Sequence, residues 1–296
     1  MTANVVLTPT EPPFDGGLKC VISPRMTHAE KADTFLALHH ADRPLLMPNP
    51  WDVGSAKLLE SLGFEALATT SSGHAATLGR LDGSVSRDEA IAHAAAIVAA
   101  TGLPVSADFE NGFADDPEGV AATVREALLA GLAGCSIEDS TGRPEAPIYD
   151  VGVAAARVAA AAEAAHSGPV RLVLTARAEN FLHGRADLAD TIARLQAYQE
   201  AGADVLYAPG LRDPGDIRSV VAAVDLPVNV LALPGAPSVS ELAEAGVKRV
   251  SVGGAFAFAA LGAVVEAARE LLDHGTYGYG ALAKTGSQAV RAAFGA

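Results

Sequence analysis

Short apolar runs alternate along this chain with longer segments in which apolar residues recur every three or four positions. The short runs contain few polar residues, as expected for strands that are buried on both faces of a sheet. Four of them follow a glycine that closes a helical pattern, and glycine is the residue that helix C-termini prefer. The pattern predicts eight strands, at residues 43–50, 61–70, 103–110, 130–139, 168–176, 201–210, 226–233 and 245–254.

Helical patterns occupy nearly every gap between these runs. Clear examples are found at residues 87–102, 117–131, 185–202 and 238–246, with further helices expected at 27–40 and 280–294. Eight strand–helix units in a chain of this length predict an α/β fold of the (β/α)8 TIM-barrel type. The alternative is an open doubly wound sheet, but its G-x-G-x-x-G marker after the first strand is absent.

The barrel is expected to form one domain over residues 26–296, including the C-terminal helices. Residues 1–25 are rich in Thr, Pro and Gly and are expected to form a flexible tail. The net charge of −14 disfavours a nucleic-acid partner, because phosphate binding needs an excess of Lys and Arg. Apolar runs are too short or too interrupted for a membrane span, and no signal peptide is evident.

Two cysteines, Cys20 and Cys135, lack the spacing of a metal site and fit a reducing compartment. We therefore expect a cytoplasmic protein. Cys135 lies at the start of its strand, away from the βα loops, and is interpreted as a core residue.

Acidic residues gather where predicted strands end, which is the catalytic face of such barrels. Asp108 and Glu110 are two positions apart and so are expected to point to the same side, with Glu138 arriving from the next strand. Three carboxylates at one barrel mouth repel one another unless a cation lies among them. Oxygen ligands favour a hard ion, so the sequence predicts a Mg²⁺ site, with Mn²⁺ as a possible substitute.

Several neighbouring features leave alternatives open. The Asn-Gly pair at 111–112 is also a hairpin signal, but Asp115, Asp116 and Pro117 open a helix pattern there. Asp115, Asp116 and Asp139 are expected to be helix N-caps or solvated loop residues. Arg177 suits capture of a substrate carboxylate or phosphate, or else an ion pair that neutralises the acids. The Gly-Gly pair at 253–254 suits either a phosphate cradle or tight packing against the next helix.

The ordered runs NPWDVGSAKLLESLGFEALATTSSG, LGRLDG, SADFENGF, SIEDS, LTARAE, PVNVLA and RVSVGGA resemble the isocitrate lyase/phosphoenolpyruvate mutase superfamily over about residues 43–275. The resemblance implies a (β/α)8 barrel in a homo-oligomer, a tetramer or dimer, whose eighth helix is exchanged between subunits. It also implies Mg²⁺-assisted breakage or formation of a C–C or P–C bond in a small carboxylate.

The resemblance further implies roles for individual residues. Asp108 is implied as a direct metal ligand, with Glu110 and Glu138 acting through water and Asp82 as an acid near the metal shell. Substrate contacts are implied for the backbone of the Thr70, Ser71 and Ser72 turn, for Arg177 at the oxyanion or carboxylate, and for Asn229.

The chain departs from named members of the superfamily in its predicted lid. Residues 140–150 read STGRPEAPIYD and lack the cysteine, lysine and histidine of isocitrate and methylisocitrate lyases. They also lack the Asn and lysines of phosphonate-forming mutases. Pro209 stands where strand 6 of the lyases ends in glutamate. Neither named activity transfers directly.

The remaining residues favour a Mg²⁺-dependent C–C lyase acting on a small 2-oxo or 2-hydroxy dicarboxylate, through an enolate stabilised by the metal and Arg177. Oxaloacetate decarboxylation is the most economical form. An acylmalate or methylisocitrate type of cleavage also needs a base, for which Tyr149, His74 or metal-bound water is available. The alternatives are P–C chemistry of the phosphonopyruvate hydrolase or phosphoenolpyruvate mutase type, and a barrel that binds a 2-oxo acid without turnover.

Overall fold

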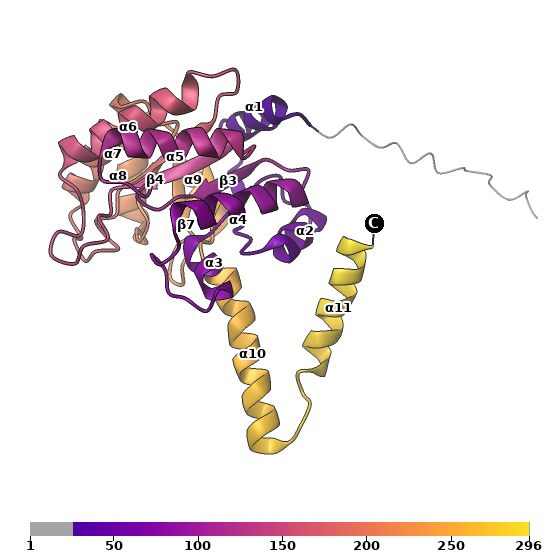
Figure 1. Cartoon of the computed structure of the whole chain (residues 1–296). Coiled ribbons are helices and arrows are strands. Elements are labelled where there is room, and N and C mark those ends of the chain that lie inside the picture. Colours follow the sequence, from indigo (N-terminus) through magenta and orange to yellow (C-terminus); the bar gives the residue numbers. More distant parts are fainter. Residues whose placement is uncertain (1–25, 296) are drawn as a thin grey trace, which may run out of the picture.

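The computed structural model describes residues 26–295, so the predicted tail at 1–25 lies outside the described residues. Eight parallel strands form a nearly closed barrel surrounded by helices (Figure 1). The strands are β1 (Leu45–Met47), β2 (Leu67–Ala68), β3 (Val105–Asp108), β4 (Gly134–Glu138), β5 (Val173–Arg177), β6 (Val205–Tyr207), β7 (Val228–Leu231) and β8 (Arg249–Ser251).

Strand order excludes the open doubly wound alternative. Each strand pairs with its neighbour in sequence from β2 to β8, and β8 pairs with β1. On the remaining side, the Ala68 N–H donates a hydrogen bond of 3.1 Å to the Pro48 carbonyl. The predicted (β/α)8 barrel is therefore confirmed.

The predicted helices are all present, and several begin with a side-chain cap. Asp116 caps α5 and Pro117 is its first residue. The Asn-Gly pair at 111–112 therefore lies in a turn that leads into a helix, and not in a hairpin. The helices are α1 (His28–Leu38), α2 (Val53–Ser61), α3 (Ser71–Thr77), α4 (Arg87–Ala100), α5 (Pro117–Leu129), α6 (Val151–His166), α7 (Leu188–Glu200), α8 (Pro214–Ala223), α9 (Val239–Glu244), α10 (Ala255–His274) and α11 (Gly280–Phe294).

Helix α1 packs against the barrel residues at the N-terminal ends of the strands. Its Phe35 is fully buried in a cluster with Leu45, Val173 and Val205 from three strands. The following His39 is also buried, and its Nδ1 lies 2.7 Å from the Phe35 carbonyl. Because a carbonyl only accepts, Nδ1 carries the proton, and burial lowers the pKa of His39 to about 3. The barrel floor thus contains a neutral imidazole.

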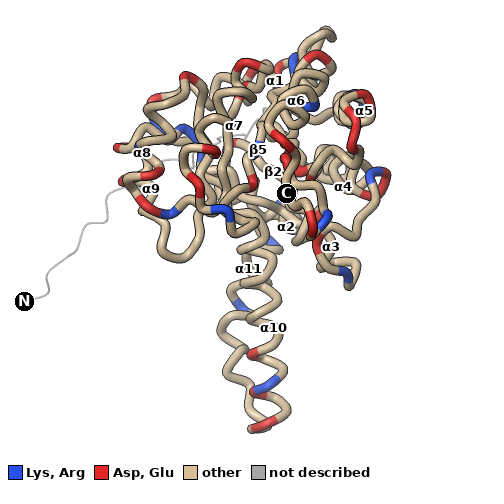
Figure 2. Tube along the Cα trace, turned by 90° about the vertical axis from the view of Figure 1, so that its left-hand side faces the viewer, with Lys and Arg blue, Asp and Glu red and all other residues tan. Residues whose placement is uncertain are grey.

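Helices α10 and α11 form a long arm that projects away from the barrel (Figures 1 and 2). Only Ala257 of α10, and no residue of α11, is buried. Helix α11 runs back from the tip of the arm toward α2, where Lys57 Nζ lies 6.0 Å from the centre of the Phe294 ring. No helix within residues 26–295 is long and apolar enough to cross a membrane.

Candidate active site

Arg177 stands at the centre of the acidic barrel mouth. At the end of β5, it reaches the acids of two neighbouring strands: Nη1 lies 2.9 Å from Asp108 Oδ1 and Nη2 lies 3.0 Å from Glu138 Oε2. Its Nε also donates to Glu179 Oε1 at 2.8 Å. The ion-pair alternative for Arg177 is therefore the one seen here, and each nitrogen of the guanidinium has a carboxylate partner.

The acids nevertheless outnumber the cation that faces them. Burial raises the pKa of Glu138 well above its usual range, although Arg177 opposes the shift. Burial also raises the pKa of Glu110 to about 7, with further upward contributions from Asp108 and Asp82. The Glu110 carboxylate forms no hydrogen bond or ion pair with any described residue. The mouth therefore holds more acidic groups than one guanidinium can neutralise, and without a further cation some of them take up protons.

Glu110 lies beyond the strand that was expected to orient it. Strand β3 ends at Asp108, and Glu110 has a φ of 47°, in the left-handed region that non-glycine residues rarely adopt. The Glu138 N–H donates to the Glu110 carbonyl at 2.9 Å, which fixes this turn against β4. The period-two argument therefore does not apply beyond Asp108, because the chain turns before Glu110, although both residues line a common small cavity.

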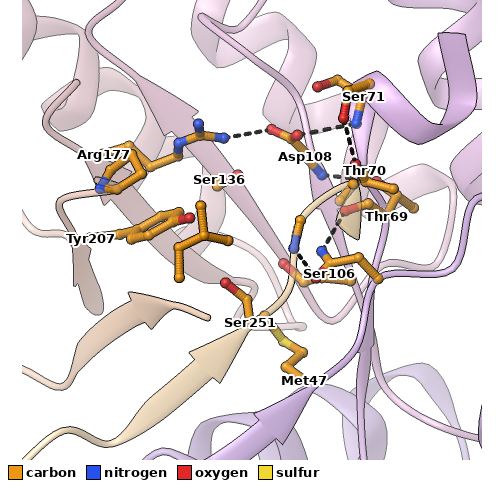
Figure 3. A pocket seen from close by; sticks show the side chains of 18 of the residues that line it. Met47, Thr69, Thr70, Ser71, Ser106, Asp108, Ser136, Arg177, Tyr207 and Ser251 are labelled. Atoms are coloured by element: carbon orange, nitrogen blue, oxygen red, sulfur yellow. Dashed lines mark hydrogen bonds and ion pairs between the residues drawn. The ribbon is translucent and has the colours of Figure 1, made fainter. Parts of the chain in front are cut away.

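Two adjoining cavities open at this end of the barrel. The inner cavity, of about 170 Å³, extends from Asp108 and Arg177 to Met47 and Ser251 (Figure 3). The outer cavity, of about 740 Å³, is lined by Glu110 and Glu138 among others. Four residues line both cavities, namely Ser71, Asp82, Arg177 and Leu182. The predicted acids are thus brought together, but on two connected sides of Arg177.

The predicted substrate turn forms the start of α3 beside Asp108. Thr70 caps this helix, and its hydroxyl lies 3.2 Å from that of Ser72. The Ser71 N–H donates to Asp108 Oδ2 at 3.2 Å, so in this structure a protein carboxylate receives it (Figure 3). A helix N-terminus favours such a negative group, which shows that the turn suits a carboxylate.

The donor set at the mouth fits a magnesium ion in chemistry, although no ready-made cage exists. Within residues 26–295, no group of three His, Cys, Asp or Glu side chains is arranged to enclose a metal. Mg²⁺ is commonly held by one or two carboxylates together with water and substrate, so such a cage is not required. The Glu110 carboxyl has no partner, and the acidic groups at the mouth outnumber the single guanidinium of Arg177. Both features suit a hard cation beside Asp108.

Two predicted site residues lie away from the cavity walls. The Tyr149 hydroxyl donates to Asp115 Oδ1, and Tyr149 lines neither cavity, so we drop it as the base. Asn229 is buried, and its amide donates to Ser251 Oγ at 3.0 Å, so it does not meet the inner cavity directly. Both side chains are committed to protein partners.

The expectation that Asp139 is a helix N-cap or a solvated loop residue is wrong. It is buried and accepts hydrogen bonds from Arg194 Nη1 at 3.0 Å and from the Tyr198 hydroxyl at 2.6 Å. Asp139 Oδ1 also accepts the Glu179 N–H at 2.8 Å, which holds the segment following β5 in place. This acid supports the site from below and does not face it.

The two residues of the Gly-Gly pair serve packing. The Gly253 N–H already donates to Asn49 Oδ1 at 2.9 Å. A Cβ on Gly254 would lie 2.6 Å from Ser72 Oγ and 2.7 Å from a ring carbon of Phe258, closer than real contacts allow. The geometry favours the tight-packing alternative, since it seats α10 against the start of α3.

Asp115 contacts both arms of the lid at the rim of the barrel. A single bridge joins Ser140 to Ile148, and Arg143 Nη1 lies 2.9 Å from Asp115 Oδ2. Asp115 also receives the Tyr149 hydroxyl, so both arms of the lid hairpin meet the same exposed carboxylate.

Three wall or supporting residues received no role from the sequence, although Glu179 and Tyr207 were expected at the ends of their strands. Glu179 follows Arg177 by two positions, and this spacing was a usable signal for an ion pair. Tyr207 lies under Arg177, with 5.3 Å between the guanidinium carbon and the ring centre, and lines the inner cavity. Arg249 also lines that cavity, and a basic residue within an apolar strand was the signal for it.

The barrel with its acidic mouth and arginine defines a site of the lyase and mutase class. Residues 35–272 match the family model for phosphoenolpyruvate phosphomutase. The chain belongs to this family, within the phosphoenolpyruvate mutase/isocitrate lyase superfamily of lyases and mutases.

Individual relatives agree with that assignment. A crystal structure from Burkholderia cenocepacia J2315, designated a lyase/mutase, has 55% identity and a TM-score of 0.83, covering 84% of this chain and 90% of that one. An uncharacterised protein from Mycobacterium tuberculosis is 35% identical, covering 81% of this chain and 89% of its own length. Oxaloacetate decarboxylase from Pseudomonas paraeruginosa is 30% identical, covering 83% and 87% respectively.

Proposed function

We propose that this protein is a Mg²⁺-dependent carbon–carbon lyase that acts on a small 2-oxo or 2-hydroxy dicarboxylate. Decarboxylation of an oxaloacetate-like acid is the reaction that its residues support best. The observation that carries the proposal is the acidic cluster around Arg177 at the mouth of a cavity of small-molecule size. The similarity to oxaloacetate decarboxylase over most of both chains supports the same substrate class.

In the proposed complex, Asp108 would hold the metal directly, Glu110 and Glu138 would hold it through water, and Asp82 would lie nearby. A bound Mg²⁺ would supply Lewis-acid polarisation of the 2-oxo group. The substrate carboxylate lies at the turn formed by Thr70, Ser71 and Ser72, where helix α3 begins.

The chemical step needs little from the lid. When the bond beyond the carbonyl breaks, its electron pair moves onto the carbonyl oxygen as an enolate, and CO₂ leaves without requiring a proton. Arg177 stabilises that oxygen through charge-assisted hydrogen bonds. Because Asp108 pairs with Arg177 Nη1 in this structure, the proposal requires that this ion pair opens when substrate binds. Solvent supplies the proton that converts the enolate to pyruvate.

The absence of the cysteine, lysine and histidine from residues 140–150 is compatible with this step. A cleavage that requires one of those residue types as the acid in the lid is less well supported. The P–C alternative is favoured by the description of the family model and by a 39% identical crystal structure from Burkholderia cenocepacia J2315 that is designated a phosphonomutase. It needs a cation for the phosphonyl group, and the lid's Arg143 is already paired with Asp115.

The test is pyruvate release from oxaloacetate and from substituted malates, with and without Mg²⁺. Because Mg²⁺ alone decarboxylates oxaloacetate slowly, an enzyme-free blank and the Asp108→Asn variant must be run beside the wild type. Asp88→Asn, at an exposed acid of α4, is the matched control and should keep full activity. The proposal expects metal-dependent turnover that Asp108→Asn abolishes. Phosphate release from phosphonopyruvate without C–C turnover would favour the P–C alternative, and ligand binding without any turnover would favour the non-catalytic one.

A further inference from the structure

Arg249 lies inside the barrel beneath the acidic mouth and helps to line the inner cavity. Its side chain is held by three polar neighbours. Nε donates to Asn229 Oδ1 at 2.9 Å, and Nη1 donates to Thr175 Oγ1 at 2.9 Å and lies 3.3 Å from His39 Nε2. All three partners are neutral: Asn229 and Thr175 carry no charge, and burial lowers the pKa of His39 to about 3, so its single proton lies on Nδ1.

The charge of Arg249 is uncompensated within the described residues. A guanidinium has five N–H donors, and Nη2 makes no hydrogen bond to any residue in 26–295. No Asp or Glu of that range pairs with Arg249, although the residue is only 3% exposed. Although Nη2 has no partner, it is not a fully buried atom. This agrees with the inner cavity reaching it.

The contrast with Arg177 shows what Arg249 lacks. Arg177 has three carboxylate partners, whereas an unpaired buried charge such as that of Arg249 carries a penalty of several kcal/mol. Burial lowers the pKa of Arg249 to about 9, partly opposed by Tyr207, so the group stays charged at neutral pH. A position of this kind is completed by an anion, and the planar guanidinium matches a carboxylate.

The barrel geometry separates the two arginines along its axis. The pairing register runs Arg177–Tyr207–Asn229–Arg249 across β5 to β8. Because barrel strands tilt from the axis, three strand spacings shift the position by about 8 Å along it. Contact of Arg249 with His39 fixes the direction of that shift, toward the floor formed by α1. The inner cavity therefore has a cation at each end.

We propose that Arg249 selects dianionic acids by binding their far carboxylate when the 2-oxo or 2-hydroxy acid end lies at the mouth. A carboxylate that leaves as CO₂ gives up this contact, so Arg249 sets the binding affinity and does not assist the chemical step. The identity of the mouth end rests on the proposed function. Asn229 becomes a positioning residue, because it holds Arg249 Nε with its amide oxygen and Ser251 with its amide nitrogen. Arg249 would thereby be the residue that selects short dicarboxylates over monocarboxylates.

Calorimetric binding of malate and of 2-hydroxybutyrate tests this inference, because the two acids differ only in a terminal carboxylate or methyl group. With Mg²⁺ present and malate recovery checked by NMR, wild type should bind malate at least about tenfold more tightly. Arg249→Gln should remove that preference while leaving 2-hydroxybutyrate binding within about twofold, and Arg249→Lys should keep part of the preference. Arg43→Gln, at an exposed arginine, is the control for loss of charge alone.

Equal affinities for the two acids in wild type would overturn the inference, and this comparison holds even where Arg249→Gln does not fold. An unchanged preference in folded Arg249→Gln would overturn it as well. Turnover of oxaloacetate together with equal binding of malate and 2-hydroxybutyrate would support the proposed function and overturn only the role of Arg249. Tighter binding of malate without any turnover would support the role of Arg249 and overturn the proposed function.

Discussion

Replacing Arg177 by methionine removes the one cation that three carboxylates of the mouth share. The side chains of Arg177, Asp108 and Glu138 are 14%, 18% and 15% exposed, so these are largely buried ion pairs. Removing one partner of a buried pair costs about 3–5 kcal/mol. The acids that lose their partner can take up protons, which limits this cost. We therefore expect the free energy of unfolding to fall by about 3 kcal/mol at pH 8, near the lower end of that range.

The pH dependence of that loss follows from the acids. Glu138 already has a raised pKa, and loss of Arg177 raises it further above the unfolded value. A carboxyl whose folded pKa is raised contributes stability below its unfolded pKa and loses it as the pH rises through the folded value. The destabilisation by Arg177→Met should therefore be largest at pH 8 and fall to less than half by pH 5.

Urea unfolding followed by circular dichroism, at one protein concentration, measures this effect. The control is Arg43→Met, which removes an exposed ion pair with Glu65 and should cost less than about 1 kcal/mol at either pH. A loss for Arg177→Met no larger than that of the control, or one that does not change with pH, would refute the reasoning.

Three further predictions address packing, the lid and assembly. Gly254→Ala should lose about 1–3 kcal/mol in urea unfolding because its new methyl group overlaps two side chains, whereas Gly262→Ala meets no atom within 4 Å and should not destabilise. Asp115→Asn should speed tryptic cleavage within residues 140–150 without changing far-UV circular dichroism; an unchanged cleavage rate would contradict its anchoring role. Val264→Glu, at a 64% exposed position of α10, should lower the molar mass measured by light scattering if the arm joins subunits, and an unchanged mass would argue against that proposal.

The barrel was predictable because its signals are local. A glycine such as Gly131, which adopts a φ of 81° after α5, and the apolar runs beside it mark each helix–strand junction within a few residues. Asp108, Glu138 and Arg177 were also predictable as a group, since the ends of neighbouring parallel strands meet at one face.

The remaining site depends on contacts between distant segments. Nothing near Asp139 in sequence shows that it is buried beneath Arg194, which lies 55 residues away. Likewise, the Tyr149 hydroxyl donates to Asp115 and does not line the cavity. That contact depends on how the lid lies on the rim of the barrel. The left-handed turn at Glu110 defeats a period-two rule that holds only within the strand.

The proposed chemistry depends on a divalent cation that Asp108, with Glu110 and Glu138, would hold at the barrel mouth. Anomalous scattering from crystals soaked in Mn²⁺ and oxalate tests it most directly. We predict one strong peak beside Asp108, with oxalate between that peak and the start of α3, and no peak in Asp108→Ala crystals. A mouth without a peak in the wild type, or a peak that survives in Asp108→Ala, would contradict the claim.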